Sequence, residues 1–308
     1  MRRDWPRAVG LLLGCGLDRA FGDPRSGHPV ALFGSAAGRL ERRLNTRTVT
    51  AGVVAEAVAV LPIVALGTAL ERRGPLMRCM ATAGATFVVL GSRTLADEAS
   101  LVADYLGAGN LPGAREQVTH LVGRVTDDLT ETEITRAATE SVAENSSDAV
   151  VAALFWGVVA GVPGLLGYRA INTLDAMWGH RSDRYERFGK TAARADDAAN
   201  LLPARLTALL VAAVRPDATG AIRRTVARDA SAHPSPNAGV VEAAFAAALG
   251  VRLGGRNVYA SGAEDRGTLG DGGPPPVTAL RSAVRLLGRV SVAAAAVSVV
   301  ASLPRPGR

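Results

Sequence analysis

The chain has 308 residues, of which 48% are hydrophobic and 4% aromatic, and its mean hydropathy of +0.17 is high for a soluble enzyme. The formal net charge of +7 is carried almost entirely by arginine, because Lys190 is the one lysine. No basic run is interleaved with aromatic residues, which argues against a nucleic-acid partner. Cys15 and Cys79 lie in apolar segments and provide neither a metal-binding pair nor a disulfide framework. The richness in Ala, Val, Leu and Gly instead favours helices that pack closely in lipid.

The first 90 residues predict a short helix followed by a transmembrane hairpin. The amino terminus looks like a secretory signal, but its apolar core over 8–13 falls short of the roughly 7–15 residues that such signals have. We therefore expect a short, half-inserted helix there rather than a cleaved leader. The clearest spanning segment is 49–70, interrupted by Glu56. A tight turn over 71–75 and a second apolar segment over 76–90 complete the hairpin.

The middle of the chain changes from polar to apolar at one junction. Residues 91–148 are polar with a heptad-like apolar spacing, which predicts amphipathic helices outside the hydrocarbon. Residues 150–166 are apolar but contain Gly157, Gly161 and Pro163, which predicts a kinked or re-entrant segment. If this segment crosses fully, the polar regions on its two sides face opposite sides of the membrane. If it is re-entrant, both face one site, and we favour this second topology.

The rest of the chain gives five weaker predictions. They are a polar loop over 167–200, an apolar segment over 201–214 that is too short to span unless it begins before Asn200, an Ala-rich amphipathic or interfacial helix over 239–251, a Gly/Pro/Asp-rich loop over 260–276, and a closing apolar helix over 290–303. No repeat or linker divides the chain. We expect one all-α domain over 1–308, a polytopic integral membrane protein with about four or five transmembrane or re-entrant helices and large polar helical loops.

Three carboxylates mark the polar-to-apolar junction. Glu140, Glu144 and Asp148 recur every four residues, so on a helix they form one stripe. Like charges at this spacing repel by a few tenths of a kcal/mol per pair, and a carboxylate drawn into the bilayer costs roughly 3 kcal/mol. A stripe at a membrane boundary therefore needs cations or a metal ion. This is a functional-site hypothesis, and a solvated helix face is its alternative.

Two further clusters lie in proline-containing turns. Asp23 and His28 surround the turn at Pro24, where a simple loop explains the residues equally well. His233 precedes Pro234, so it cannot sit in the middle of a helix. It is either a general base or a loop anchor, and the sequence leaves both open.

The fourth cluster extends from Asn172 to Arg205. Asn172 and Asp175 are three residues apart, and Asp196 and Asn200 are four apart, so each pair shares a helix face. Carboxylate and carboxamide oxygens near guanidinium groups suit Mg²⁺ and a nucleotide phosphate. Ordinary interfacial salt bridges are the alternative.

Taken in chain order, these segments resemble those of the adenosylcobinamide-phosphate synthase family of cobalamin biosynthesis, the CobD/CbiB type. The segments that carry the resemblance are Gly22-Asp23-Pro24 with His28-Pro29-Val30, Glu140-Ser141-Val142-Ala143-Glu144-Asn145, Asn172-Thr173-Leu174-Asp175, Ala193-Arg194 with Asp196-Asp197, and His233-Pro234-Ser235-Pro236-Asn237-Ala238-Gly239. No single segment is decisive, but the ordered set is specific.

The resemblance implies a multi-pass enzyme of the inner (plasma) membrane. It would join a propionate carboxyl of adenosylcobyric acid to the amine of (R)-1-amino-2-propanol or its O-phosphate. ATP and Mg²⁺ are the implied cofactors, and other proteins of the corrinoid pathway are the implied partners.

On this hypothesis the candidate residues take three roles. The candidate catalytic residues are Glu144, His233, Asn145 and Asp175. The candidate substrate- and phosphate-binding residues are Arg181, Arg184, Arg194, Arg205, Asn172, Asn200, Ser235, Asn237, Asp23 and His28. The candidate Mg²⁺ ligands are Glu140, Glu144, Asp148, Asp175, Asp196 and Asp197.

Two other classes compete with the enzyme. A transporter for a corrinoid or another anionic solute would suit Glu56 within a span and the broken segment 150–166. The long polar regions argue against it. A regulatory or scaffold protein without chemistry of its own is the third class.

Overall fold

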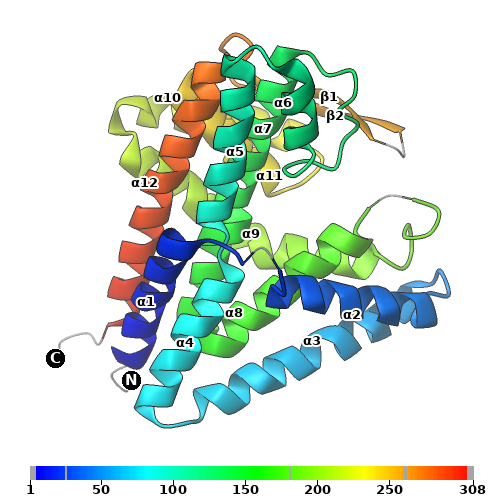
Figure 1. Ribbon diagram of the computed structural model, residues 1–308, viewed down its shortest axis with the longest axis vertical. Helices are drawn as coiled ribbons and strands as arrows, with labels where there is room; N and C mark the ends of the chain where they lie inside the picture. Colours follow the sequence, from blue (N-terminus) through cyan, green and yellow to red (C-terminus); the bar gives the residue numbers. More distant parts are fainter. Residues whose placement is uncertain (1–4, 25, 181, 260–261, 304–308) are drawn as a thin grey trace. The chain divides into compact units, whose positions relative to one another are not determined.

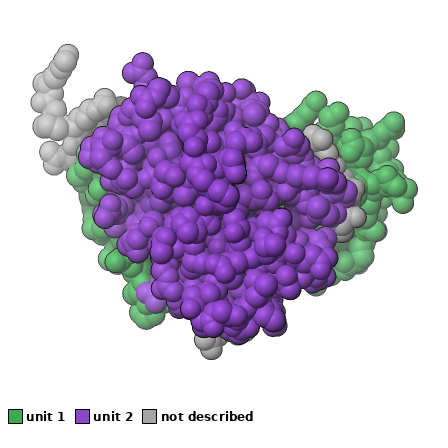
Figure 2. Space-filling model, turned by 90° about the horizontal axis from the view of Figure 1, so that it is seen from above, with its two compact units in different colours: residues 1–91, 152–200, 294–308 green, residues 92–151, 201–293 purple. Residues whose placement is uncertain are grey.

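The computed structural model describes residues 5–24, 26–180, 182–259 and 262–303, which are helical apart from one small two-stranded sheet (Figure 1). This confirms the predicted helical class. The chain forms two compact units, coloured separately in Figure 2, and each is built from segments that are distant in sequence. Unit 1 comprises Met1–Gly91, Ala152–Asn200 and Ala294–Arg308, and unit 2 comprises Ser92–Val151 and Leu201–Ala293.

Unit 1 is a helical assembly. Its elements are α1 (Trp5–Phe21), α2 (Pro29–Leu44), α3 (Val49–Glu71), α4 (Pro75–Val89), α8 (Ala152–Trp178), the first part of α9 (Lys190–Val214) and the last part of α12 (Val277–Ser302). A core of Ala, Leu and aromatic side chains holds α2, α3, α8 and α9 together, with Trp178 against Phe188 at a ring distance of 5.2 Å.

Helix α1 is longer than the short helix expected from its amino-terminal apolar core. It has 17 residues and packs along α4 through its glycines. A Cβ on Gly10 would lie 2.6 Å from Cβ of Thr82, and one on Gly14 would collide with Thr86. Close packing through small residues, expected from the composition, is thus confirmed at this helix pair.

Within the described ranges, five helical segments are long and apolar enough to cross a membrane, which agrees with the predicted number. They are Val49–Glu71, Pro75–Gly107, Glu131–Trp178, Lys190–Val214 and Val277–Ser302. Helix α3 exposes Val53, Val58 and Leu61, an outward apolar surface that lipid would cover.

The predicted bend in the apolar segment after the acidic stripe is confirmed. Helix α8 is interrupted at Gly161, where φ is 66° and ψ is −144°, a conformation open essentially to glycine. Gly164 then lies against the backbone of Trp156 so closely that a Cβ would not fit. Residues eight apart on a straight helix are separated by about 12 Å. The chain therefore turns back on itself within unit 1.

Glu71 and Arg7 together hold the backbone on the two sides of this break. Its Oε2 accepts the N–H of Val162 at 3.0 Å, and its Oε1 accepts Nη2 of Arg7 at 2.7 Å and Nε of Arg78 at 2.8 Å. Arg7 Nη1 in turn donates to the carbonyl of Val158 at 3.0 Å. A carboxylate thus caps the helix that begins after the break, and a guanidinium caps the one that ends before it.

Unit 2 surrounds one buried helix. Its elements are α5 (Ser92–Gly107), α6 (Leu111–Val118), α7 (Glu131–Ser146), the π-helical turn η1 (Ser147–Val151), the last part of α9, the 3-10 turn η2 (Pro216–Ala218), α10 (Thr219–Asp229), the 3-10 turn η3 (Ala230–Ala232), α11 (Ala238–Leu249), β1 (Leu253–Tyr259), β2 (Gly262–Leu269) and the first part of α12. Ten of the twelve residues of α11 are buried, from Ala238 to Ala248.

Two predictions about this half of the chain are wrong. The expected amphipathic helix is the buried α11, because Ala and Val let α7 and α10 pack closely around it. Part of the expected loop over 260–276 is strand β2 (Gly262–Leu269), since paired backbone groups, rather than apolar side chains, define the hairpin. The charged side chains and glycines of β2 are typical of a loop. In β1, Gly254 and Gly255, with φ of 79° and 85°, form an irregularity in the strand pairing.

The predicted loop over 167–200 is also mostly helical. Helix α8 continues to Trp178 and α9 begins at Lys190, so 179–189 connects them. Because α9 begins before Asn200, its 25 residues are long enough to span.

Candidate functional site

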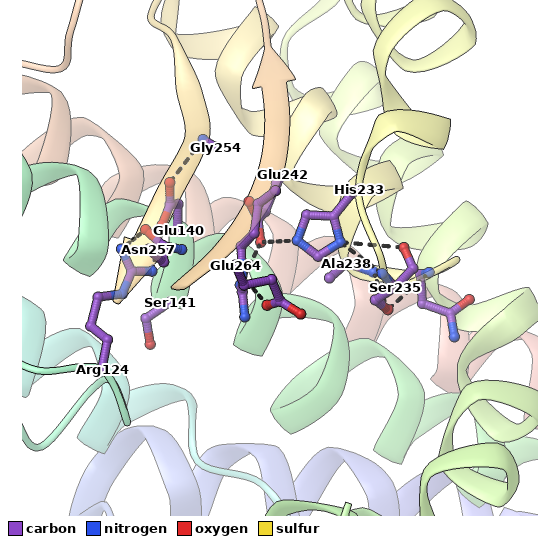
Figure 3. A network of polar contacts seen from close by, with 12 residues as sticks. Arg124, Glu140, Ser141, His233, Ser235, Ala238, Glu242, Gly254, Asn257 and Glu264 are labelled. Atoms are coloured by element: carbon purple, nitrogen blue, oxygen red, sulfur yellow. Dashed lines mark hydrogen bonds and ion pairs between the residues drawn. The ribbon is translucent and has the colours of Figure 1, made fainter. Parts of the chain in front are cut away.

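Unit 2 contains a buried charge cluster, which we define as Arg124, Glu140, Glu144, His233, Glu242 and Arg266. Helix α7 supplies Glu140 and Glu144, and it begins at a capping box formed by Thr130 and Glu133. The loop before α7 supplies Arg124, the turn before α11 supplies His233, α11 supplies Glu242, and β2 supplies Arg266. Figure 3 shows Arg124 beside Glu140, and His233 directed at Glu242.

Glu140 is fully engaged by protein groups. It is 1% exposed, and Arg124 Nη2 donates to its Oε2 at 2.6 Å. The backbone N–H of Gly254 donates to Oε1 at 2.8 Å, while Arg124 Nη1 donates to Asn257 Oδ1 at 2.7 Å. The pair therefore ties α7 to strand β1 (Figure 3).

The other residues of the acidic stripe differ from Glu140. Glu144 is half-buried, and no hydrogen-bond partner for its carboxylate is found in the described ranges. The side chain of Asn145 bonds to its own helix, because its Nδ2 donates to the carbonyl oxygen of Ser141 at 3.0 Å. Asp148 lies in η1, and such π-helical turns often occur at functional sites. The sequence spacing places Glu140 and Glu144 on one helix face, but it gives no sign of the π-helical turn.

The turn before α11 fixes His233 and caps the helix. Ser235 Oγ accepts the N–H of Asn237 at 3.3 Å and that of Ala238 at 3.2 Å. His233 Nδ1 accepts the N–H of Ser235 at 3.0 Å, and its Nε2 lies 3.6 Å from Glu242 Oε1. Burial, followed by the charge of Arg266, lowers the pKa of His233. The imidazole is therefore held neutral, with its Nε2–H directed to Glu242.

Glu242 is the central residue of the cluster, and sequence reasoning did not select it. It is 0% exposed, and both carboxylate oxygens lack a hydrogen-bond donor among the described residues. Burial, followed by the charges of Glu140 and Glu144, raises the pKa of Glu242 well above its ordinary value. Arg266 Nη1 lies 3.8 Å from its Oε1, too far for a hydrogen bond. The one sequence feature that could have identified Glu242 as a site residue is that it is a carboxylate within an Ala-rich helix. The sequence around Arg124 and Arg266 carries no such feature.

A cavity of about 410 Å³ lies beside this cluster within unit 2. Its wall includes Arg205, Ser231, His233, Pro234 and Pro236. The Nη1 of Arg205 donates to the side-chain oxygen of Asn237 at 2.8 Å. The cavity therefore combines an exposed guanidinium with the outer side of the histidine turn, a setting suited to an anionic group.

Unit 1 contains a second polar cluster, between α8 and α9. Asp196 Oδ1 accepts Nδ2 of Asn172 at 3.2 Å, and its Oδ2 accepts Nδ2 of Asn200 at 2.9 Å. Tyr168 donates its hydroxyl to Asn200 Oδ1 at 2.9 Å. The shared face predicted for Asp196 and Asn200 is confirmed. A largely apolar cavity of about 420 Å³ borders Tyr168 and Trp156.

The remaining candidates of unit 1 lie in other places. Arg184 makes two hydrogen bonds to the buried Glu41, at 2.9 and 2.7 Å. Asp23 and His28 form a local pair, 3.5 Å apart, at the start of α2. Arg194 is exposed on α9, the half-buried Asp197 also lies on α9, Asp175 lies near the end of α8, and Arg181 is outside the described residues.

The predicted metal ligands are divided between the two units. Glu140, Glu144 and Asp148 are in unit 2, whereas Asp175, Asp196 and Asp197 are in unit 1. Within the described ranges, no group of three or more His, Cys, Asp or Glu side chains is arranged to hold a metal ion.

Comparison with known proteins gives one family. The sequence model of the family described as CobD/Cbib protein matches residues 11–287. The cobalamin biosynthesis protein CobD of Mycobacterium tuberculosis (strain CDC 1551 / Oshkosh) is 51% identical over 298 residues, which cover 96% of this chain and 95% of that protein. Proteins of the same name from Rhodobacter capsulatus and Stutzerimonas stutzeri are 44% and 43% identical, covering 87% and 91% of this chain and 88% and 91% of their own. No solved structure matches.

Proposed function

The chain belongs to the CobD/CbiB family, and from that premise we propose that it catalyses the ATP-dependent joining of adenosylcobyric acid to 1-amino-2-propanol or its phosphate. A role in cobalamin biosynthesis is the broader statement that its relatives' names carry. The five apolar helical segments fit a multi-pass protein, for which we propose the cell membrane as the location.

The observation that supports ligation best is the buried charge cluster of unit 2. A carboxylate is a poor electrophile, so ATP must first convert the propionate to an acyl phosphate or a similar species. The incoming amine is protonated at neutral pH and must lose a proton before it attacks. Carboxylates with few hydrogen-bond partners, such as Glu144 and Glu242, can accept that proton, and buried guanidinium groups stabilise developing negative charge.

The cavity bordered by Arg205 is the proposed place for a phosphate group. In unit 1, Asn172, Asp196 and Asn200 are proposed substrate contacts. The carboxylates in the described part of the chain do not form a metal site by themselves, so no step is assigned to a protein-held Mg²⁺. We propose instead that Mg²⁺ enters with the nucleotide phosphates, as it commonly does.

The test is to supply the purified, detergent-solubilised protein with adenosylcobyric acid, ATP, Mg²⁺ and either form of the amine. Ligation predicts an amide product together with ADP or AMP, identified by mass spectrometry. Uptake of corrinoid into proteoliposomes without amide formation would indicate a transporter instead. Neither product nor uptake would indicate a scaffold protein.

A further inference from the structure

Glu242 is a buried carboxylate to which no described residue donates a hydrogen bond. Neither oxygen accepts a hydrogen bond from the described residues, and His233 Nε2, itself buried and unbonded, faces Oε1 at 3.6 Å (Figure 3). The side-chain nitrogen of Asn257, which is 2% exposed, is a fourth polar atom of this network without a hydrogen-bond partner among the described residues. Unmet buried polar groups are destabilising, so their concentration here needs an explanation.

The surrounding charges favour one additional cation. Arg124 is committed to Glu140 and Asn257, and the more exposed Arg136 lies 3.8 Å from Glu140. His233 is neutral because its Nδ1 accepts the N–H of Ser235. Arg266 is the guanidinium that acts most strongly on Glu144 and Glu242. The carboxylates of Glu144 and Glu242 therefore share the guanidinium of Arg266 as their main counter-charge.

Arg266 is itself loosely held. Its Nη1 is 3.8 Å from Glu242 and its Nε is 3.5 Å from Glu264, with Nε unbonded, and its guanidinium lies 5.7 Å from the Tyr259 ring centre. It stands on β2 of a two-stranded hairpin, an element that has little stability of its own. Displacing this guanidinium breaks no short hydrogen bond to Glu242.

We propose that Glu144 and Glu242 bind the primary ammonium group of the amine substrate, and that Arg266 occupies this position until the ammonium displaces it. This inference rests on the proposed ligation. An ammonium group carries three N–H donors, enough for both oxygens of Glu242 and one of Glu144. It is also more compact than a guanidinium, so it can approach at hydrogen-bond distance.

The same pair can deprotonate the amine. One proton passes from the ammonium nitrogen to a carboxylate oxygen, which leaves a neutral amine and a carboxylic acid. The amine lone pair then forms the C–N bond at the activated carbonyl, and the C–O bond to phosphate breaks, with the electron pair leaving on the phosphate. A second proton leaves the nitrogen for that phosphate or for water. His233 keeps its proton throughout and acts as a positioning residue.

The test uses the full-length protein and two readouts for 1-amino-2-propanol. One is its shift of the thermal unfolding temperature without ATP or corrinoid, and the other is its KM in the ligation. Glu242→Gln should abolish the shift and raise the amine KM about tenfold or more, with the KM for ATP unchanged. Arg266→Gln should act in the opposite direction and lower the amine KM. Tetramethylammonium, which has no N–H donors, should produce no shift in the wild type.

The matched control is Glu131→Gln, which removes an exposed carboxylate from the first turn of α7 and should leave both readouts as in the wild type. Glu144→Gln, measured by the thermal shift, tests the pair if Glu242→Gln does not fold. An unchanged amine KM and shift in Glu242→Gln would overturn the ammonium site while ligation stands. If the wild type forms no amide but the amine still raises its thermal unfolding temperature, and Glu242→Gln abolishes that rise, then ligation is overturned while the ammonium site stands. A weaker amine affinity in Arg266→Gln would contradict the displacement of Arg266.

Discussion

Glu140 and Glu242 are both buried carboxylates of unit 2, and their neighbours give them different properties. Glu140 accepts short hydrogen bonds from Arg124 and Gly254, whereas Glu242 accepts none from the described residues. Glu140 therefore fits a structural task, while Glu242 fits a site that exchanges a proton or a cation. Their residue type alone does not separate these tasks, because the separation depends on donors far away in sequence.

At Glu140 we predict a large loss of stability on breaking one buried ion pair. Glu140→Gln leaves the guanidinium of Arg124 buried without its counter-charge, so the free energy of unfolding should fall by about 3–5 kcal/mol. Chemical denaturation in detergent measures it. The double variant Glu140→Gln with Arg124→Met removes both charges and should recover much of the loss, and a double variant as unstable as the sum of the single variants would contradict this account.

The raised pKa of Glu242 predicts how stability changes with pH. In the unfolded chain this carboxyl loses its proton near the ordinary value of 4.5, whereas the folded protein holds the proton to higher pH. Its contribution to stability is therefore fully present below pH 4.5 and is lost as the pH rises through the folded pKa. Glu242→Gln cannot ionise, so its stability relative to the wild type should increase over that range. Thermal unfolding from pH 4.5 upward measures the difference in stability between Glu242→Gln and the wild type. A difference that stays the same at every pH would contradict this prediction.

Glu144→Gln in unit 2 and Asp175→Asn in unit 1 should each abolish ligation while the protein still inserts into the membrane. The first change removes a carboxylate of the buried charge cluster, and the second removes a carboxylate from α8. Product formation and membrane-fraction abundance are measured together. Normal activity in both variants would rule out this assignment.

Helix α8 and hairpin β1–β2 show that glycine controls both elements through backbone conformation. Helix α8 breaks at Gly161. The ion pair of Glu71 with Arg7 supplies hydrogen bonds to the free backbone groups on either side of the break. In β1, successive glycines with positive φ bend a strand whose side chains look like those of a loop. In both elements a few residues decide the path of a much longer segment.

The break in α8 gives a prediction at this scale. Gly161→Ala forces a side chain into a conformation reserved for glycine and should lower the free energy of unfolding by about 1–3 kcal/mol. Gly84→Ala is the matched control, because Gly84 lies in the regular helix α4 with open space around its Cα. It should be stabilising by roughly 0.5–1 kcal/mol. Both changes are measured by denaturation in the same detergent, and equal effects would refute the role of Gly161.

For the whole molecule, we predict that the protein resists extraction from membranes. Five apolar helical segments and the exposed Val and Leu of α3 should hold it in the bilayer. Alkaline carbonate removes proteins bound by charge alone, so the chain should stay in the pellet and be released by detergent. Release by carbonate would contradict integral membrane insertion.

The amino-acid sequence by itself determined the helical membrane class and most apolar segments, because hydrophobic length and period are local properties. It also determined the face shared by Asp196 and Asn200, and it indicated the bend near Gly161. The tertiary structure alone decided that α11 is buried, that the glycine-rich segment pairs as β1 and β2, and that Arg124 and Arg266 meet the carboxylates of α7 and α11. The contact of helix α7 with strand β1 joins residues more than a hundred positions apart in sequence, such as Glu140 with Gly254, and no local pattern encodes such a partner.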